Sequence, residues 1–190
     1  MTFKGKFTTL ETNRLILRQW QQTDLQPFAE LNADPEVMKY FPKTLSRQES
    51  DNVVARFKAM IGANQGWGLW AVEMKATGEF VGSVGLAQQP DRFDFSPCTE
   101  IGWRINKKFW GQGIAKEAAQ ASLAYAFNVL HLPEVVSFTS THNTPSEKLM
   151  QRLGMQKHTI FLHPALPADH ALAEHVLYKI FHNNFIDSPL

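Results

Sequence analysis

Short apolar runs, alternating with polar positions and ended by Gly, Pro, Asn or Asp, predict a set of β-strands along the chain. Many of their residues are β-branched or aromatic, which favours a pleated and half-buried surface. The predicted strands cover residues 15–20, 67–74, 80–86, 99–105, 135–140, 155–162 and 173–181. The second and third of these flank a turn at 76–79, so they are expected to form a hairpin.

Helices are predicted where apolar residues recur every three or four positions behind a capping sequence. Three capping boxes each open such a stretch, at residues 23–26, 46–49 and 144–147. A further helix is predicted over the alanine-rich residues 114–130. The first helix should end at Asp34, because a residue before proline avoids the α region. Gly154 stands where a left-handed C-cap would follow the last helix.

The order of these elements is strand, two helices, a three-stranded meander, helix, strand, helix and a closing pair of strands. This order predicts a mixed α/β (α+β) fold in which helices cover a central sheet. A length of 190 residues suits one domain, so residues 1–190 are expected to form a single folded unit.

Composition narrows the class of protein. Hydrophobic residues make up 44% of the chain and the net charge is only +1, which argues against disorder and against a nucleic-acid partner. Charged residues, at 19%, are sparse, which fits a well-filled core or an apolar interface in a homodimer. The N-terminal stretch holds no apolar run of signal-peptide length, and no segment approaches the roughly 20 apolar residues of a membrane span. A soluble, cytoplasmic protein without membrane contact is expected.

The segment WGQGIA, residues 110–115, lies between a predicted strand and a predicted helix. Its glycines let the backbone turn tightly, and the N–H groups at the helix start attract anions. The segment is therefore either a phosphate-binding loop or a turn that merely requires glycine. It is not a Rossmann fingerprint, which needs a third glycine where Lys116 stands, and no P-loop pattern GxxxxGK(S/T) occurs in the chain.

A wider pattern surrounds this segment. It comprises LETNRLILR at 10–18, EIGWRI and FWGQGIAKEA within 100–118, and a downstream set of Asn143, Ser146, Leu149, Met150 and Gly154. Together they resemble the GNAT superfamily of acyl-CoA-dependent N-acyltransferases over about residues 8–182. Its pattern (Q/R)xxGx(G/A) is matched at Gly113 and Ala115, with Trp110 in the first position. Tryptophan there is common in the branch of ribosomal-protein N-terminal alanine acetyltransferases, which this chain resembles most.

The resemblance implies a mostly antiparallel sheet of about seven strands flanked by about four helices, with acetyl-CoA as co-substrate and no metal. The pyrophosphate would be held by the backbone N–H groups of Gly111, Gln112, Gly113, Ile114, Ala115 and Lys116. The main chain of Trp103 and Ile105 would pair with the pantetheine arm as an added strand does, or these are only alternate residues of a buried strand. Asn143 would hydrogen-bond the pantetheine, or it is an ordinary residue before a helix cap.

The resemblance also implies a proton acceptor. An alkylammonium group has a pKa near about 10, so a base or a water chain must take its proton as the amine attacks. Glu100 opens the strand that would line the thioester, where the family often places a catalytic glutamate; the alternative is a solvated carboxylate at a strand end. The backbone N–H of Trp103 would stabilise the developing oxyanion.

The general acid is where this sequence departs from much of the superfamily. A tyrosine often lies seven residues after the asparagine, but here that position is Met150, which cannot donate a proton. Ser146 is the remaining hydroxyl, unless it serves only the helix start. Tyr125 and Tyr178 are less well placed in the sequence. A thiol of pKa about 8.5 is also a tolerable leaving group without any acid.

The other reactive side chains are expected to have structural rather than chemical roles. His163, His170 and His175 have no carboxylate at metal-ligand spacing. The single cysteine, Cys98, excludes an internal disulfide and has no nearby histidine in the sequence to activate it. Four aromatic residues are expected mainly in the core, with some shaping the acceptor wall that the family builds from its first two helices: Trp67, Trp70, Tyr40 and Phe41.

The sequence therefore favours an acetyl-CoA-dependent N-acetyltransferase. Its acceptor would be a primary amine, either a protein N-terminus or a small molecule such as an amino acid, a polyamine or an antibiotic. The alternative is a non-catalytic acyl-CoA-binding or protein-interaction module that keeps the fold, because the expected tyrosine is absent.

Overall fold

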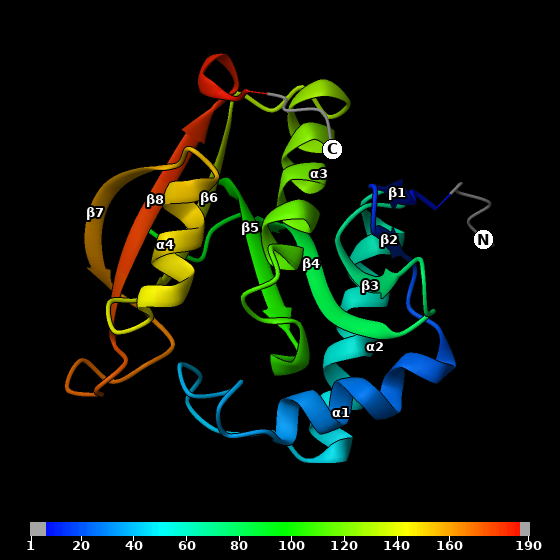
Figure 1. Ribbon diagram of the computed structural model, residues 1–190. Helices are drawn as coiled ribbons and strands as arrows, with labels where there is room; N and C mark the ends of the chain where they lie inside the picture. The colour runs from blue at the N-terminus through cyan, green and yellow to red at the C-terminus, as the bar shows by residue number, and fades with distance from the viewer. Residues whose placement is uncertain (1–6, 187–190) are drawn as a thin grey trace.

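The computed structural model describes residues 7–186, which build one eight-stranded sheet in the order β1-β2-β3-β4-β5-β6-β8-β7 (Figure 1). Neighbouring strands are antiparallel except β5 and β6, which are parallel. The strands are β1 (Leu10–Glu11), β2 (Leu15–Arg18), β3 (Leu69–Met74), β4 (Phe80–Gln89), β5 (Cys98–Ile105), β6 (Glu134–Ser140), β7 (Gln156–Leu162) and β8 (Glu174–Phe181). The predicted mixed, mostly antiparallel sheet is confirmed, with the two-residue β1 added; the outer ends of the predicted 1–190 unit lie outside the described residues.

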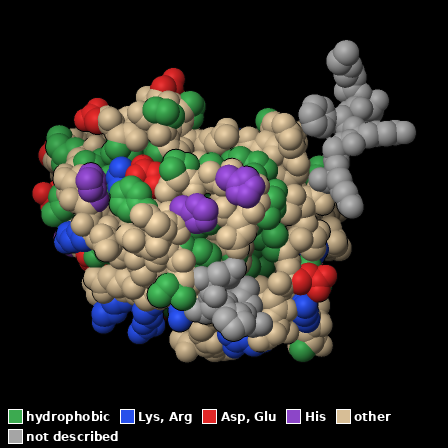
Figure 2. All heavy atoms as spheres, turned by 90° about the horizontal axis from the view of Figure 1, so that it is seen from above, with side chains coloured by type: hydrophobic (Ala, Val, Ile, Leu, Met, Phe, Trp, Pro, Cys, Tyr) green, Lys and Arg blue, Asp and Glu red, His purple; other side chains and the backbone are tan. Residues whose placement is uncertain are grey.

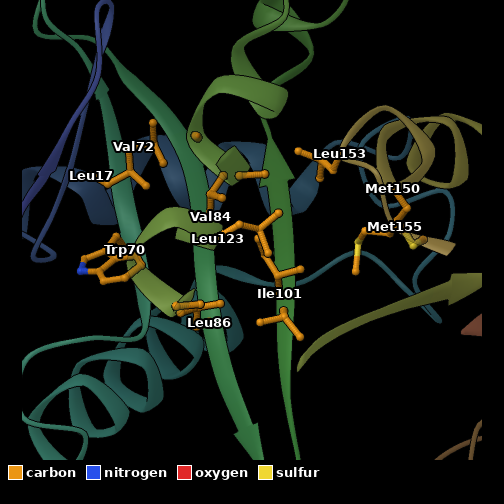
Figure 3. Packing of buried hydrophobic residues seen from close by; sticks show 14 of the residues in the cluster. Leu17, Trp70, Val72, Val84, Leu86, Ile101, Leu123, Met150, Leu153 and Met155 are labelled. Atoms are coloured by element: carbon orange, nitrogen blue, oxygen red, sulfur yellow. The ribbon is translucent and has the colours of Figure 1, made fainter. Parts of the chain in front are cut away.

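Helices pack on both faces of this sheet. They are α1 (Leu25–Ala33), α2 (Arg47–Ala63), α3 (Ile114–Asn128) and α4 (Thr144–Arg152). Strand β3 shows the two faces, because Trp70 and Val72 belong to the cluster under α3, whereas Ala71 between them packs with α1 and α2. Figure 3 shows the first cluster, in which strand residues such as Val84 and Ile101 meet Leu123 of α3. Burial of these alternating side chains holds the helices on the sheet.

Two of the predicted local signals are confirmed. At the start of α2, Ser46 Oγ accepts a hydrogen bond from the Glu49 backbone N–H at 3.3 Å, and Glu49 Oε2 accepts one from the Ser46 N–H at 2.8 Å. Gly154 has φ +82°, and the N–H of Met155 reaches back to a carbonyl of α4. A left-handed residue therefore ends this helix as its pattern predicts.

The other two predicted capping boxes are wrong in register. Before α1, Asp24 caps the backbone N–H of Gln21 at 2.7 Å, so the box opens a short 3-10 turn two residues earlier than predicted. Before α4, the capping residue is Asn143 rather than Thr144, which is the first residue of the helix. The helix at 114–130 also ends earlier than predicted, at Asn128.

Figure 2 shows both signs of charge on one face, with Lys and Arg mostly along its lower edge and Asp and Glu mostly at its upper left and right. This mixture agrees with the net charge of +1. Among the described helices, none combines the length and the apolar character that crossing a membrane requires.

Candidate active site

The sheet opens between its two parallel strands. β5 and β6 share a single register pair, Glu100 with Val136, and Ser137 Oγ donates to the Ile101 carbonyl oxygen at 2.9 Å beside it. No further register pair joins these strands toward their C-terminal ends, after which β5 leads to α3 and β6 leads to α4. Glu100 therefore lies where the opening begins.

A cavity of about 1140 Å³ occupies this opening. The segment at residues 110–115, called the glycine loop below, lines one part of the cavity together with the starts of α3 and α4. The loop after α1 lines another part. Two lining residues carry carboxylates, Glu36 and Glu100. Six carry basic side chains: Lys39, Arg92, Arg104, Lys116, Lys148 and Arg152. In a chain of net charge +1, this concentration of positive charge makes the cavity suitable for an anionic ligand.

The glycine loop has the backbone geometry of an anion site. Gly111 and Gly113 adopt φ of +72° and +77°, a left-handed conformation in which other residues are strained. Gly113 is also the N-cap of α3, and its carbonyl accepts from the Glu117 N–H at 3.0 Å. The N–H groups that precede Glu117 at the helix start have no partner within the helix, and no side chain caps them. They are free to bind a phosphate.

An ion-pair network holds this loop against the first strands. Arg14 donates to the Gln112 carbonyl oxygen at 3.0 Å and pairs with Glu117 at 2.6 Å. Thr12 Oγ1 donates to the same Glu117 carboxylate at 2.5 Å. Burial opposes ionisation of Glu117, but these hydrogen bonds hold its pKa below its ordinary value. The sequence gives no local sign of this network, because about 100 residues separate its members.

Trp110 has a structural reason to stand where the family pattern has Gln or Arg. Its indole N–H donates to the Ile105 carbonyl oxygen at 2.9 Å, which ties the glycine loop to the end of β5. Gln112 turns away, because its side-chain amide donates to the Lys108 carbonyl at 2.8 Å. Gln112 is the one residue of the predicted site that does not line the cavity; the others do, Trp103, Ile105 and Asn143 among them.

Glu100 is held by one hydrogen bond within the cavity. Gln89 Nε2 donates to its Oε2 at 2.7 Å. Its other oxygen lies 3.9 Å from the point where a Cβ on Gly102 would stand, so glycine leaves space beside the carboxylate. Burial raises the pKa of Glu100 to about 7, although Gln89 and Arg92 oppose the shift. A carboxylate with this pKa can exchange protons near neutral pH.

The start of α4 brings Asn143 and Ser146 to the same cavity. Asn143 Oδ1 accepts from the Ser146 backbone N–H at 3.3 Å, and its amide donates to Thr139 Oγ1 at 2.8 Å. Asn143 is therefore a helix cap in this structure. Ser146 Oγ accepts from the Trp103 indole N–H at 3.2 Å, which leaves its own proton available to a further acceptor.

Neither Met150 nor the two tyrosines considered above, Tyr125 and Tyr178, offers the site a proton donor. Met150 is fully buried beside Leu153 and Met155 (Figure 3). Tyr178 OH donates to Glu147 at 2.8 Å, and Tyr125 packs edge-on against Trp70. Neither tyrosine lines the cavity. At this site α4 contributes the hydroxyls of Thr144 and Ser146, and Ser146 is the one that accepts from the Trp103 indole.

The remaining reactive side chains divide between cavity and core. Trp67 and Trp70 are buried in the core, whereas Tyr40 and Phe41 line the cavity.

Burial lowers the pKa of His163 to about 4, with help from His175 and Arg92, so it is neutral at pH 7. Burial and the neighbouring Glu100 raise the pKa of the Cys98 thiol, which disfavours a nucleophilic thiolate. No group of three or more metal-ligating side chains occurs among residues 7–186.

Comparison with known proteins identifies close matches to the fold and the sequence. The family model described as Acetyltransferase (GNAT) domain matches residues 14–156. A protein of Aspergillus fumigatus named FsC-acetyl coenzyme A-N(2)-transacetylase is 36% identical over 162 residues, which is 82% of this chain and 67% of that protein.

Two solved structures show the same fold. An acetyltransferase (GNAT family) from Bacillus anthracis has a TM-score of 0.78 and 25% identity, covering 93% of this chain and 99% of its own. A ribosomal-protein-S5-alanine acetyltransferase from Vibrio fischeri has a TM-score of 0.72 at 16% identity, covering 94% of this chain and 99% of its own.

Proposed function

The chain belongs to the GNAT acetyltransferases, and from this premise we propose that it transfers an acetyl group from acetyl-CoA to a primary amine by direct attack in a ternary complex. The observation that carries the proposal is the cavity at the opening between β5 and β6. It joins the glycine loop and Glu100 in one space. The acceptor would be a protein N-terminus or a small amine.

The glycine-loop end of the cavity suits the coenzyme. Its pyrophosphate would bind the free backbone N–H groups between Gly111 and Lys116, with Lys148 and Arg152 of α4 adding positive charge. The pantetheine arm would enter the opening and pair with the main chain of β5, as an added strand does. Because the Ile105 carbonyl already accepts from Trp110, a pantetheine amide there would share or replace that hydrogen bond.

The chemistry needs one bond to form and one to break. The amine nitrogen attacks the thioester carbonyl carbon, the C–N bond forms, and the C–S bond then breaks to release the thiolate. The proton of the amine passes to Glu100, directly or through water. The thiolate finally takes a proton from water, to which Glu100 returns the one that it accepted. The Trp103 backbone N–H would stabilise the oxyanion, and a pKa of about 7 suits Glu100 to the role of base.

Ser146→Ala is expected to lower kcat by about 10–150-fold. The Ser146 hydroxyl would donate to the developing thiolate, and a hydrogen bond to a charged acceptor contributes about 1.5–3 kcal/mol. The fold should persist, because Asn143 caps the helix through the backbone N–H of residue 146, which alanine keeps. Steady-state release of free thiol from acetyl-CoA measures the effect.

Ser146→Thr is the matched variant, since it restores a hydroxyl at the same backbone position. It should recover much of the lost rate. A parental kcat in Ser146→Ala would limit the hydroxyl to the helix start, and a loss beyond about 10⁴-fold would indicate a stronger role or a displaced coenzyme.

A panel of amines and peptides tests the proposed activity itself. The protein is incubated with acetyl-CoA and each acceptor, thiol release is followed, and the product is identified by mass spectrometry. Acetylation of at least one amine is the expected result. Tight binding of CoA by calorimetry without turnover of any acceptor would favour the alternative, a non-catalytic acyl-CoA-binding module. That alternative draws on Met150, which replaces the usual proton-donating residue.

A further inference from the structure

Within the part of the chain that the structure describes, Arg104 on β5 is a cation without a carboxylate partner. Arg104 lines the cavity, and its guanidinium donates to Asn32 Oδ1 at 2.6 Å. None of the ion pairs among residues 7–186 includes it. Burial lowers its pKa to about 10, so it stays charged at neutral pH. Partly buried charges are normally paired, which makes this one a candidate for binding a ligand anion.

The nearby carboxylates are committed elsewhere. Asp34 and Glu36, on the loop after α1, both pair with Lys107, at 2.8 and 2.9 Å. Glu49 on α2 pairs with Lys43. Glu100 lies on the same strand face but four residues away, or about 13 Å along the strand, and it is bonded to Gln89. Among residues 7–186, no carboxylate therefore pairs with Arg104.

The guanidinium is held in a defined orientation. The fully buried Asn32 donates its amide to Ser50 Oγ at 2.8 Å, which turns its carbonyl oxygen toward Arg104. The guanidinium carbon lies over the ring of Phe41, 4.2 Å from the ring centroid. One N–H edge is therefore fixed by Asn32, and the remaining donors can form the paired hydrogen bonds that a carboxylate accepts.

We propose that Arg104 binds a carboxylate of the acetyl acceptor, which makes the substrate an amine that carries a carboxylate several bonds away. This inference rests on the proposed function, because it places the amine at Glu100. Glu100, Gly102 and Arg104 share one face of β5, with only glycine between the two charged side chains. The distance along β5 between Glu100 and Arg104 is too long for an α-amino acid. It favours a longer molecule, either an ω-amino acid or a peptide with an acidic group.

The test compares matched pairs of acceptors. One arm uses 6-aminohexanoate against 6-aminohexanamide, and a second uses a glutamate-containing tripeptide against its glutamine counterpart. In at least one arm the parent should show a kcat/KM about 10–150-fold higher for the carboxylate, the range for a hydrogen bond between charged groups. The arm that shows the preference identifies the source of the carboxylate.

Two variants assign the preference to this side chain. Arg104→Met keeps an unbranched chain beside Phe41 but removes the charge. Asn32→Asp keeps the guanidinium and gives it an internal carboxylate in place of the amide. Both should bring the kcat/KM ratio near one, whereas a purely structural role would change stability and leave the ratio intact. Melting temperature and CoA affinity are measured to verify that each variant folds.

Several outcomes would overturn the proposal. The proposal fails if the parent shows no preference for the carboxylate in either arm. It also fails if a folded Arg104→Met retains the preference. If no amine releases thiol although CoA binds, the proposed function fails instead. Calorimetry of the CoA-saturated parent with 6-aminohexanoate and 6-aminohexanamide then decides the carboxylate site alone, and equal affinities would refute it.

Discussion

Glu100→Gln is expected to lower kcat by about 10²–10⁴-fold while the protein stays folded. Glutamine has the same shape and can still accept the hydrogen bond from Gln89, but it cannot take a proton from the attacking amine. The loss should shrink as pH rises toward the pKa of the amine, because a larger fraction of the acceptor is then already the free amine and the rate depends less on Glu100 as base. In the parent, kcat/KM should show an inflection near pH 7 that the variant lacks, since burial raises the pKa of Glu100 to about 7.

The same substitution should change how stability depends on pH. Glu100 keeps its proton up to about pH 7 in the folded chain, against an ordinary pKa of 4.5. Between these values the folded state binds more protons than the unfolded state, so the free energy of unfolding falls as pH rises through this range. Glu100→Gln removes that penalty, and above pH 7 it should be more stable than the parent, by at most about 3 kcal/mol.

Rates and melting temperatures from pH 5 to 9 measure both effects. Glu30→Gln is the control, because this exposed carboxylate on α1 accepts a hydrogen bond from Gln26 and lies outside the cavity. It should reproduce the parental profiles. If Glu100→Gln keeps the parental pH–rate profile, the proton acceptor is water or another carboxylate.

Gly111→Asp is expected to weaken CoA binding by about 10²–10³-fold relative to Gly111→Asn. Asp and Asn have nearly the same shape, and both tolerate the left-handed conformation that φ of +72° requires. No atom of the surrounding structure lies within 4 Å of the added Cβ, so neither side chain is crowded. Asp alone brings a negative charge beside the pyrophosphate, and two like charges about 4 Å apart repel by about 4 kcal/mol near a protein surface.

Calorimetric titration of both variants with CoA measures this difference. Gly111 is a better position than Gly113 for the test. A side chain at Gly113 would meet the Arg14 guanidinium, 3.5 Å from the added Cβ, which would partly neutralise an aspartate. Equal affinities of the Asp and Asn variants would place the pyrophosphate away from this loop.

Local signals in the sequence predicted the elements of the fold well. The alternation of apolar residues located the strands, and the capping box at Ser46 and the glycine at 154 depend on residues within one helical turn. The predicted capping residue of α4 is wrong because Asn143 and Thr144 are both good caps, and only the backbone geometry of Asn143 distinguishes them. β1 has two residues and pairs only with β2, so it leaves little periodicity to detect.

The candidate site also contains residues that the sequence predicts and one, Arg104, that it does not. Its glycine loop, Glu100, Asn143 and Ser146 were found through spacing and family resemblance, and the structure places them around one cavity. Arg104 is not among the predicted site residues, although its sequence does carry a signal: it is a charged residue within the apolar run IGWRI, two positions from Gly102 and four from Glu100. Its lack of a carboxylate partner depends on α1, α2 and their loop, which no local pattern places beside β5.

The separation of β5 from β6 also bears on how this protein avoids aggregation. Each strand has an unpaired edge there, and unpaired edges normally invite the strands of other molecules to add to a sheet. These edges lie in the middle of an eight-stranded sheet, with α3 following one strand and α4 following the other. They therefore do not lie at the rim of the sheet, where the strand of another molecule would most easily add. A ligand with a single extended chain can enter the opening between β5 and β6 end-on. The position of these strand edges therefore favours ligand binding over self-association.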